Sequence, residues 1–209
     1  MTCPLETRPT LNEGIERQIL QQLRGRFLTV NQGRLARATE GLAPGQQTLL
    51  SLLALLFHVN CPALPGYVSD CTPAGVSGYE PQASTLAAAQ HLDRTFSYTV
   101  CPSRLPSSIY GIFLMGSLGT LAQTDQSDMD VWVCLAPGLG DAALAKLRKK
   151  CRLLEAWAAS QGNEAHFYLI DVQRFAQGDV DAPRHTDDGR APRHTLLLDE
   201  FYRTAIWLA

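Results

Sequence analysis

Apolar positions recur at helical spacing near the start of the chain. One face repeats every four residues and consists of Ile15, Ile19, Leu23 and Phe27. This spacing predicts an amphipathic helix from about residue 11 into the thirties. Proline is favoured in the first turn of a helix, so Pro44 indicates a second helix that runs to about Val59.

The pattern becomes irregular and then changes period. Residues 60–81 hold four prolines and three glycines, which predicts an irregular segment, and a third helix is expected over residues 84–95. Short apolar runs bounded by turn residues then predict buried strands at Ile109–Met115, Met129–Leu135 and His166–Asp171. A helix over residues 141–160 separates the last two strands.

The end of the chain divides into a polar and an apolar part. Residues 173–195 are rich in Asp, Arg, Gly and Pro and are expected to form a loop. Residues 196–209 have the pattern of an apolar helix with no cap and no polar tail. A domain rarely stops on such a pattern, so the chain is expected to be cut from a longer protein.

These elements together predict an α/β protein, more closely α+β, with a small mixed sheet flanked by helices. We assign residues 1–100 to an amino-terminal helical region. Residues 101–209 then form the sheet-containing core, which is expected to be truncated at its carboxyl end.

Composition narrows the classes of partner. Of the 209 residues 45% are hydrophobic and 18% are charged, and the net charge is -2, which gives no reason to expect nucleic acid or a membrane surface. The longest apolar run, Leu49–Phe57, is too short to span a bilayer, which takes about 20 residues. The six cysteines form no C-x-x-C pair, so they indicate reduced thiols in a cytoplasmic protein rather than a zinc site.

The first candidate for chemistry is Gly116-Ser117, directly after the first predicted strand. A short helix starting here would offer backbone amides to a phosphate, and glycine permits close approach. The dipeptide is a weak signal by itself.

The second candidate is the pair Asp128 and Asp130, at the start of the next strand. Two residues apart on an extended chain, the carboxylates point to the same face and repel each other. A hard cation such as Mg²⁺, with Mn²⁺ as the alternative, would neutralise them and bind triphosphate oxygens. Alone, such a pair is common on protein surfaces.

The third candidate is Asp171, which ends the third predicted strand. If that strand lies beside the Met129–Leu135 strand, its carboxylate is expected to reach the same metal or to accept the proton of an attacking hydroxyl. An aspartate here is otherwise a turn former or helix cap. The combined order of strand, Gly-Ser, Asp-x-Asp strand, helix, strand and Asp is the signature of the nucleotidyltransferase (polymerase-beta-like) fold.

The segment YGIFLMGSLGTLAQTDQSDMDVWVC resembles class I bacterial adenylate cyclases, in which Gly-Ser precedes a polar loop and Ser-Asp-Leu-Asp-Ile-Trp-Val-Cys. The matching residues are Ser127, Asp128, Asp130, Trp132, Val133 and Cys134. The blocks HVNCPALPGYV, KCRLLEAWAASQGNEAHFYLID and HTLLLDEFYRTAIWLA are also similar to that family. The resemblance implies a lyase that converts ATP to 3′,5′-cyclic AMP and pyrophosphate.

The resemblance and the residues suggest a division of roles. Metal ions on Asp128 and Asp130 would bridge the phosphates, Asp171 would act on the ribose 3′-hydroxyl as a ligand or base, and Gly116 and Ser117 would hold the outer phosphates. Softer candidates for substrate contact are Ser127, Lys149 and Lys150. The favoured interpretation of the lysines is a solvated helix face, with a triphosphate contact as the alternative, and His58, His91 and His166 are interpreted as packing or surface residues.

Two alternatives stay open. A different nucleotidyltransferase would move AMP from ATP to a hydroxyl acceptor with the same fold and the same acids. A nucleotide-binding fragment without activity of its own is the other alternative, because the family's catalytic region extends past the end of this chain.

Overall fold

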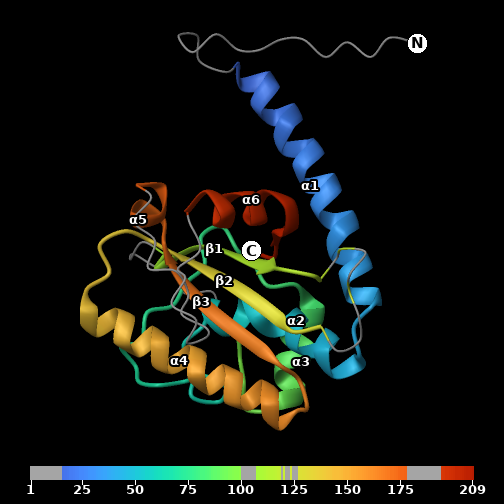
Figure 1. The fold of residues 1–209 in the computed structure, drawn as a ribbon. Helices are drawn as coiled ribbons and strands as arrows, with labels where there is room; N and C mark the ends of the chain where they lie inside the picture. Colours follow the sequence, from blue (N-terminus) through green and yellow to red (C-terminus); the bar gives the residue numbers. More distant parts are fainter. Residues whose placement is uncertain (1–15, 100–106, 119, 121–122, 124–126, 178–193) are drawn as a thin grey trace.

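A mixed sheet organises the protein (Figure 1). The structure is a computed structural model that describes residues 16–99, 107–118, 120, 123, 127–177 and 194–209. Its four strands are β1 (Ile109–Met115), β2 (Met129–Leu135), β3 (Ala165–Asp171) and β4 (Ile206–Trp207), in the order β3-β2-β1-β4. β1 is antiparallel to β2 and to β4, whereas β2 and β3 are parallel.

The parallel pair explains the longest helix beside the sheet. Two parallel strands need a crossover connection, and α4 (Asp141–Ser160) supplies it between β2 and β3. α4 lies on one face of the sheet together with α2 (Pro44–His58) and α3 (Ala83–Leu92) (Figure 1). This helix-covered face, called the aliphatic face below, buries Met129, Val131 and Val133 of β2 completely.

The opposite face of the sheet is thinly covered. Two helices lie over it, α5 (Val172–Ala176) and α6 (His194–Thr204) (Figure 1). A separate small cluster of Met115, Trp132 and Ile170 packs here against Phe175 and Phe201. This surface is called the aromatic face below.

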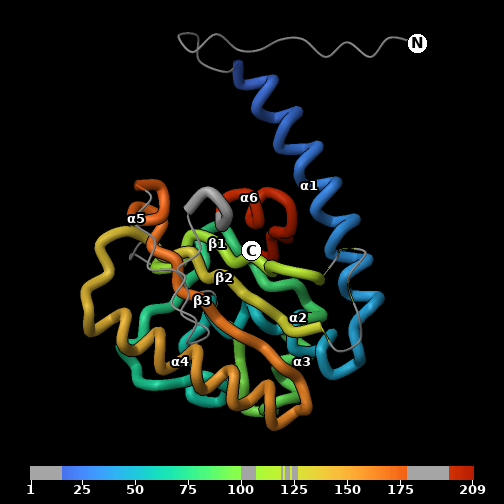
Figure 2. The backbone as a smooth tube through the Cα atoms, in the orientation of Figure 1, coloured from blue at the N-terminus to red at the C-terminus, as the bar shows by residue number. Residues whose placement is uncertain are grey.

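The amino-terminal helix α1 (Arg17–Glu40) is attached to the body through its carboxyl-terminal half. Asn31 Nδ2 donates to the Trp207 carbonyl at 2.8 Å, and the Trp207 amide donates to Asn31 Oδ1 at 2.8 Å. The other half projects away from the sheet (Figure 2). The predicted apolar face, including Leu23 and Phe27, is therefore about half exposed in the described part of the chain.

The structure confirms the type and approximate bounds of the predicted helices and strands. α3 ends before residue 95 because Asp93 Oδ1 accepts hydrogen bonds from the amide and hydroxyl of Thr95, at 2.7 and 2.6 Å. The sequence pattern did not predict two elements, α5 and β4. α5 lies in the predicted polar loop, of which residues 178–193 are outside the described residues.

The predicted carboxyl-terminal helix is in part wrong. It divides after Thr204 into α6 and the short strand β4, because Ile206 and Trp207 pair with Leu114 and Phe113 of β1. Among the described cysteines, Cys61, Cys71, Cys134 and Cys151 are free thiols. None of the helices in the described ranges has both the length and the apolar character that crossing a bilayer requires.

Candidate functional site

Asp130 lies where three strands of the sheet meet. It is the second residue of β2, opposite Met115 of β1 and His166 of β3. The Tyr168 hydroxyl donates to Asp130 Oδ1 at 3.4 Å. Burial, followed by the charge of Asp130, raises the pKa of Tyr168 to about 12, so this phenol keeps its proton at neutral pH.

Asp128 joins two donors that the sequence interpretation did not assign. One ligand atom from each of Asp128, Glu164 and His166 lies within 4.8 Å of the other two. His166 Nε2 and Glu164 Oε1 are 3.3 Å apart. The register of β2 and β3 explains this grouping, because His166 is the residue opposite Asp130.

The reading of His166 as a packing or surface residue is therefore incomplete. Its imidazole lies with two carboxylates at the start of a parallel strand pair. A signal existed in the sequence: a helix that connects two apolar strands predicts a parallel pair, and the starts of parallel strands share one edge of the sheet. Asp128 and Asp130 lie at the start of the strand before the helix. Glu164 and His166 lie at the start of the strand after it.

Gly116 forms a turn against Asp130 rather than the start of a helix. Its φ is 82°, a left-handed value that suits glycine, and residues 116–118 form a turn, so the described part of the connection does not contain the short helix that could have started here. A Cβ at this position would lie 3.3 Å from Asp130 Oδ2. The Gly116 amide donates to Thr204 Oγ1 at 3.3 Å, so α6 holds the turn in place.

Ser117 and Ser127 lie near the two ends of the connection between β1 and β2, which leads to Asp128. The Ser117 carbonyl accepts from the Thr120 hydroxyl at 2.6 Å and from the Thr120 amide at 3.0 Å. The Ser127 carbonyl accepts from Gln46 Nε2 of α2 at 3.4 Å. Both backbone groups therefore help to fix the connection that carries Asp128.

Asp171 does not reach this group, and the expectation that it shares the metal is wrong. Because β2 and β3 are parallel, it lies opposite Leu135. It is five residues beyond His166, or about 16 Å along the strand. Its Oδ1 accepts from the amides of Gln173 and Arg174, at 2.9 and 3.1 Å. Asp171 is therefore the cap of α5, which is the competing reading of this residue.

Lys149 and Lys150 lie on α4, across the sheet from Asp130. Lys150 is 1% exposed, and its ammonium is 6.0 Å from the centroid of the Phe57 ring. Burial lowers the pKa of Lys150 to about 8. The expected triphosphate contact is wrong for Lys150, and the structure does not bring the exposed Lys149 to the acids.

The chemistry of the donor set suits a divalent cation. Carboxylate oxygens from Asp128 and Glu164 offer the hard ligands that Mg²⁺ prefers, and Asp130 lies opposite His166 beside them. The imidazole of His166 is a ligand that also suits first-row transition ions such as Mn²⁺. The site faces solvent at Asp128 and Glu164, which leaves room for the oxygens of a phosphate.

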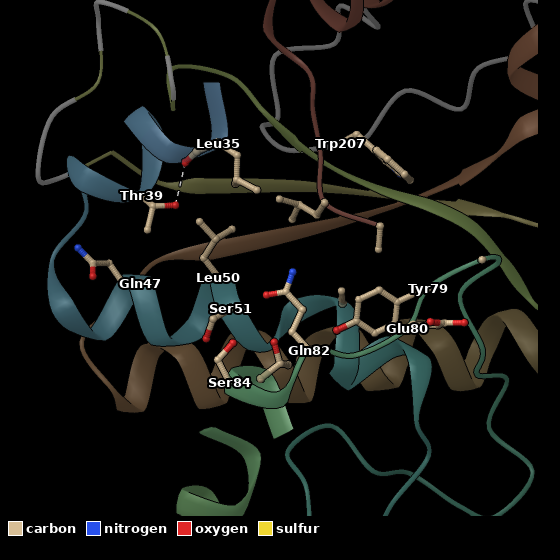
Figure 3. Close-up of a pocket in the computed structure, with 15 residues that line it drawn as sticks. Leu35, Thr39, Gln47, Leu50, Ser51, Tyr79, Glu80, Gln82, Ser84 and Trp207 are labelled. Atoms are coloured by element: carbon tan, nitrogen blue, oxygen red, sulfur yellow. Dashed lines mark hydrogen bonds between the residues drawn. The ribbon is translucent and has the colours of Figure 1, made fainter. Parts of the chain in front are cut away.

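A separate cavity of about 530 Å³ lies between α1, α2 and residues 78–85 (Figure 3). Leu35 and Thr39 of α1 line it, together with Leu50 of α2 and Tyr79. Neither Asp128 nor Asp130 borders this cavity. It is therefore distinct from the acidic site.

Comparisons with known proteins agree on one family. The model of the family described as "Adenylate cyclase NT domain" matches residues 19–209. The adenylate cyclase of Salmonella typhimurium strain LT2 is 37% identical over 191 residues, which is 91% of this chain and 22% of that protein. The adenylate cyclase of Escherichia coli K12 has the same identity and coverage.

The adenylate cyclase of Yersinia pestis is 36% identical over 193 residues. The chain thus spans only 22% of the length of the curated relatives that it matches. No solved structure matches it.

Proposed function

Because the chain belongs to the adenylate cyclase amino-terminal domain family, as the motif around Asp128 and Asp130 predicted, we propose that it supplies the metal- and phosphate-binding part of a class I adenylate cyclase. The reaction converts ATP to 3′,5′-cyclic AMP and pyrophosphate. The observation that carries the proposal is the placement of Asp130 between the Gly116 turn and His166, with Asp128 beside the same imidazole.

A nucleotidyltransferase fold is part of the proposal. The Gly-Ser turn ends β1, and the Asp-x-Asp pair opens the antiparallel neighbour β2. The turn and the acids therefore meet at one edge of a mixed sheet. This supports the fold assignment by the order and direction of the strands.

Asp128, Glu164 and His166 would hold the cation, Mg²⁺ or Mn²⁺, and the charge of Asp130, opposite His166, would help to attract it. When bound, it would neutralise the charge of the triphosphate and polarise the phosphorus that is attacked. Tyr168 orients the Asp130 carboxylate by its hydrogen bond. Gly116 leaves space for a phosphate oxygen to approach that carboxylate and its cation, because no side chain stands there.

The proton of the ribose 3′-hydroxyl needs an acceptor, and Asp171 is too far from the other acids to serve. Asp130 is the best placed of the described carboxylates, since it is oriented by Tyr168 and lies beside the Gly116 turn. Attack of the 3′-oxygen on the α-phosphorus forms the cyclic ester and breaks the bond to pyrophosphate. The proton moves to Asp130 Oδ2 in this step.

The test is the formation of cyclic AMP by full-length protein with ATP and Mg²⁺ or Mn²⁺. Asp130→Asn is expected to lower the rate by at least about 100-fold. Asp171→Asn is the matched control and should retain most of the activity. Product analysis also separates cyclisation from transfer of AMP to a hydroxyl acceptor. Full activity of the Asp130→Asn variant would contradict the proposal.

A further inference from the structure

A second cavity lies on the aromatic face, between α5 and α6. Its volume is about 390 Å³, within the range of small-molecule sites, which is about 300–1,000 Å³. Its lining includes Trp132, Cys134, Ile170, Phe175, Ala176 and Phe201. They come from β2, β3, α5 and α6, so the described elements form both its floor and its walls.

Aromatic rings make up much of this lining. Trp132 and Phe201 stack with ring centroids 5.7 Å apart and an angle of 26° between their planes. Phe175 meets Trp132 edge-on, with centroids also 5.7 Å apart and an angle of 75°. Trp132 is only 4% exposed beneath these contacts, whereas Phe175 and Phe201 are partly exposed, so the two phenylalanine rings form the aromatic surface that a flat ligand can reach.

The cavity continues the acidic site along the same strand. Asp130, Trp132 and Cys134 alternate along β2 and therefore share one face of the sheet. Successive side chains on one face are about 6.6 Å apart. Tyr168 connects the two regions, because it lies opposite Trp132 and donates to Asp130.

We infer that this cavity binds the purine base of the nucleotide whose phosphates are held at Asp128 and Asp130. The inference rests on the proposed function and extends it to the other end of the substrate. The ribose then lies over the start of β2, and the base packs against Phe175 and Phe201, with the buried Trp132 supporting both rings from below. Stacking on aromatic side chains is a general mode of base binding that does not depend on charge.

The electrostatics of the cavity agree with a neutral, flat ligand. Cys134 is the residue of β2 that lines it beyond Trp132, and burial raises the pKa of its thiol to about 11. The thiol therefore stays neutral at physiological pH. The negative charges of the site are at Asp128 and Asp130, where the cation and phosphates belong.

The decisive variant is Ala176→Phe, which places a ring at the exposed rim of the cavity without altering the sheet. Ala156→Phe is the matched control, because it makes the same change at an exposed position of α4 on the other side of the sheet. Binding to full-length protein is measured by calorimetry with Mg²⁺ and two probes. These are a non-hydrolysable ATP analogue and inorganic tripolyphosphate, which has no base.

We expect Ala176→Phe to lower the affinity for the ATP analogue at least tenfold and to leave the affinity for tripolyphosphate unchanged. Ala156→Phe should change neither affinity. Unchanged binding of the analogue to Ala176→Phe, or an equal loss of both probes, would overturn the inference.

The failure of the proposed function has a different signature. If Asp130→Asn lowers the affinity for both probes while Ala176→Phe lowers neither affinity, the assignment of the phosphate site is supported and that of the base site is contradicted. If Asp130→Asn leaves both affinities intact, the phosphate site itself is wrong, and the base site falls with it.

Discussion

The two faces of the sheet are built for different tasks. The aliphatic face carries α2, α3 and α4 and is packed with fully buried side chains such as Leu53 and Val133. Among the described residues, the aromatic face carries α5 and α6, the cavity between them and the candidate acids at one edge. The main core therefore lies on one side of β2 and the candidate site on the other, although neighbouring residues of one strand belong to both.

Removing a large side chain from the aliphatic face should have the largest effect on folding. Phe57 is fully buried and its ring lies 5.5 Å from that of Phe167. Phe57→Ala is expected to lower the free energy of unfolding by about 3–5 kcal/mol, measured by denaturant titration. Phe175→Ala on the aromatic face should cost clearly less, since Phe175 is partly exposed. Equal losses would remove the distinction between the faces.

A substitution of Lys150 should act in the opposite direction. Its pKa is lowered to about 8 by burial, so keeping it charged destabilises the native protein at neutral pH. Lys150→Met is expected to raise the free energy of unfolding by about 1–3 kcal/mol at pH 7. The exposed Lys149→Met is the control and should change little.

The pH dependence gives that prediction a second check. Between pH 8 and 10.5, the ordinary pKa of a lysine side chain, native Lys150 loses its proton while the unfolded chain keeps it. The free energy of unfolding of the protein with Lys150 therefore rises relative to that of Lys150→Met as the pH increases through this window. A constant difference between pH 7 and pH 10 would contradict the burial of a charged amine.

Gly116 tests the aromatic face at its acidic edge, and Gly138 offers a close control. Their φ values are 82° and 83°, so alanine strains the backbone equally, by about 1–2 kcal/mol. Only at Gly116 does the new Cβ meet Asp130, at 3.3 Å, whereas nothing lies within 4 Å at Gly138. Gly116→Ala should weaken Mn²⁺ binding about tenfold by calorimetry, one step of about 1.4 kcal/mol, and Gly138→Ala should not.

The smallest effect is expected at Tyr168. Tyr168→Phe removes the hydroxyl that donates to Asp130 at 3.4 Å but keeps the ring. Orienting partners of metal ligands usually matter less than the ligands, so we expect Mn²⁺ affinity to fall by a few-fold with little change in stability. A loss as large as that of Asp130→Asn would show that Tyr168 is itself a ligand.

The sequence predicted what depends on local pattern. The apolar runs of β1, β2 and β3 were recognisable because buried strands and their turn residues are contiguous, and Asp128 and Asp130 were visible as charges at the edge of such a run. Asp171 could not be placed in this way. Its distance from Asp130 depends on whether β3 runs parallel or antiparallel to β2, which follows from the helical connection between the strands and not from the local pattern around Asp171.

Burial on a helix was equally hard to predict. Lys149 and Lys150 are neighbours in a basic run, yet one is exposed and the other is buried. What separates them is the packing of α4, on which Lys150 contacts Phe57 of α2. The strand β4 depended on a pairing with β1, more than ninety residues away in the chain.

The anchoring of α1 has a mechanical consequence. Arg34 Nη2 donates to the Thr204 carbonyl at 2.6 Å, and the Thr204 hydroxyl accepts the Gly116 amide at 3.3 Å. The projecting arm is thus connected to the turn beside Asp130 through two residues. A displacement of α1 is therefore expected to disturb that turn, and the paired hydrogen bonds of Asn31 with Trp207 oppose such a displacement by fixing the helix to β4.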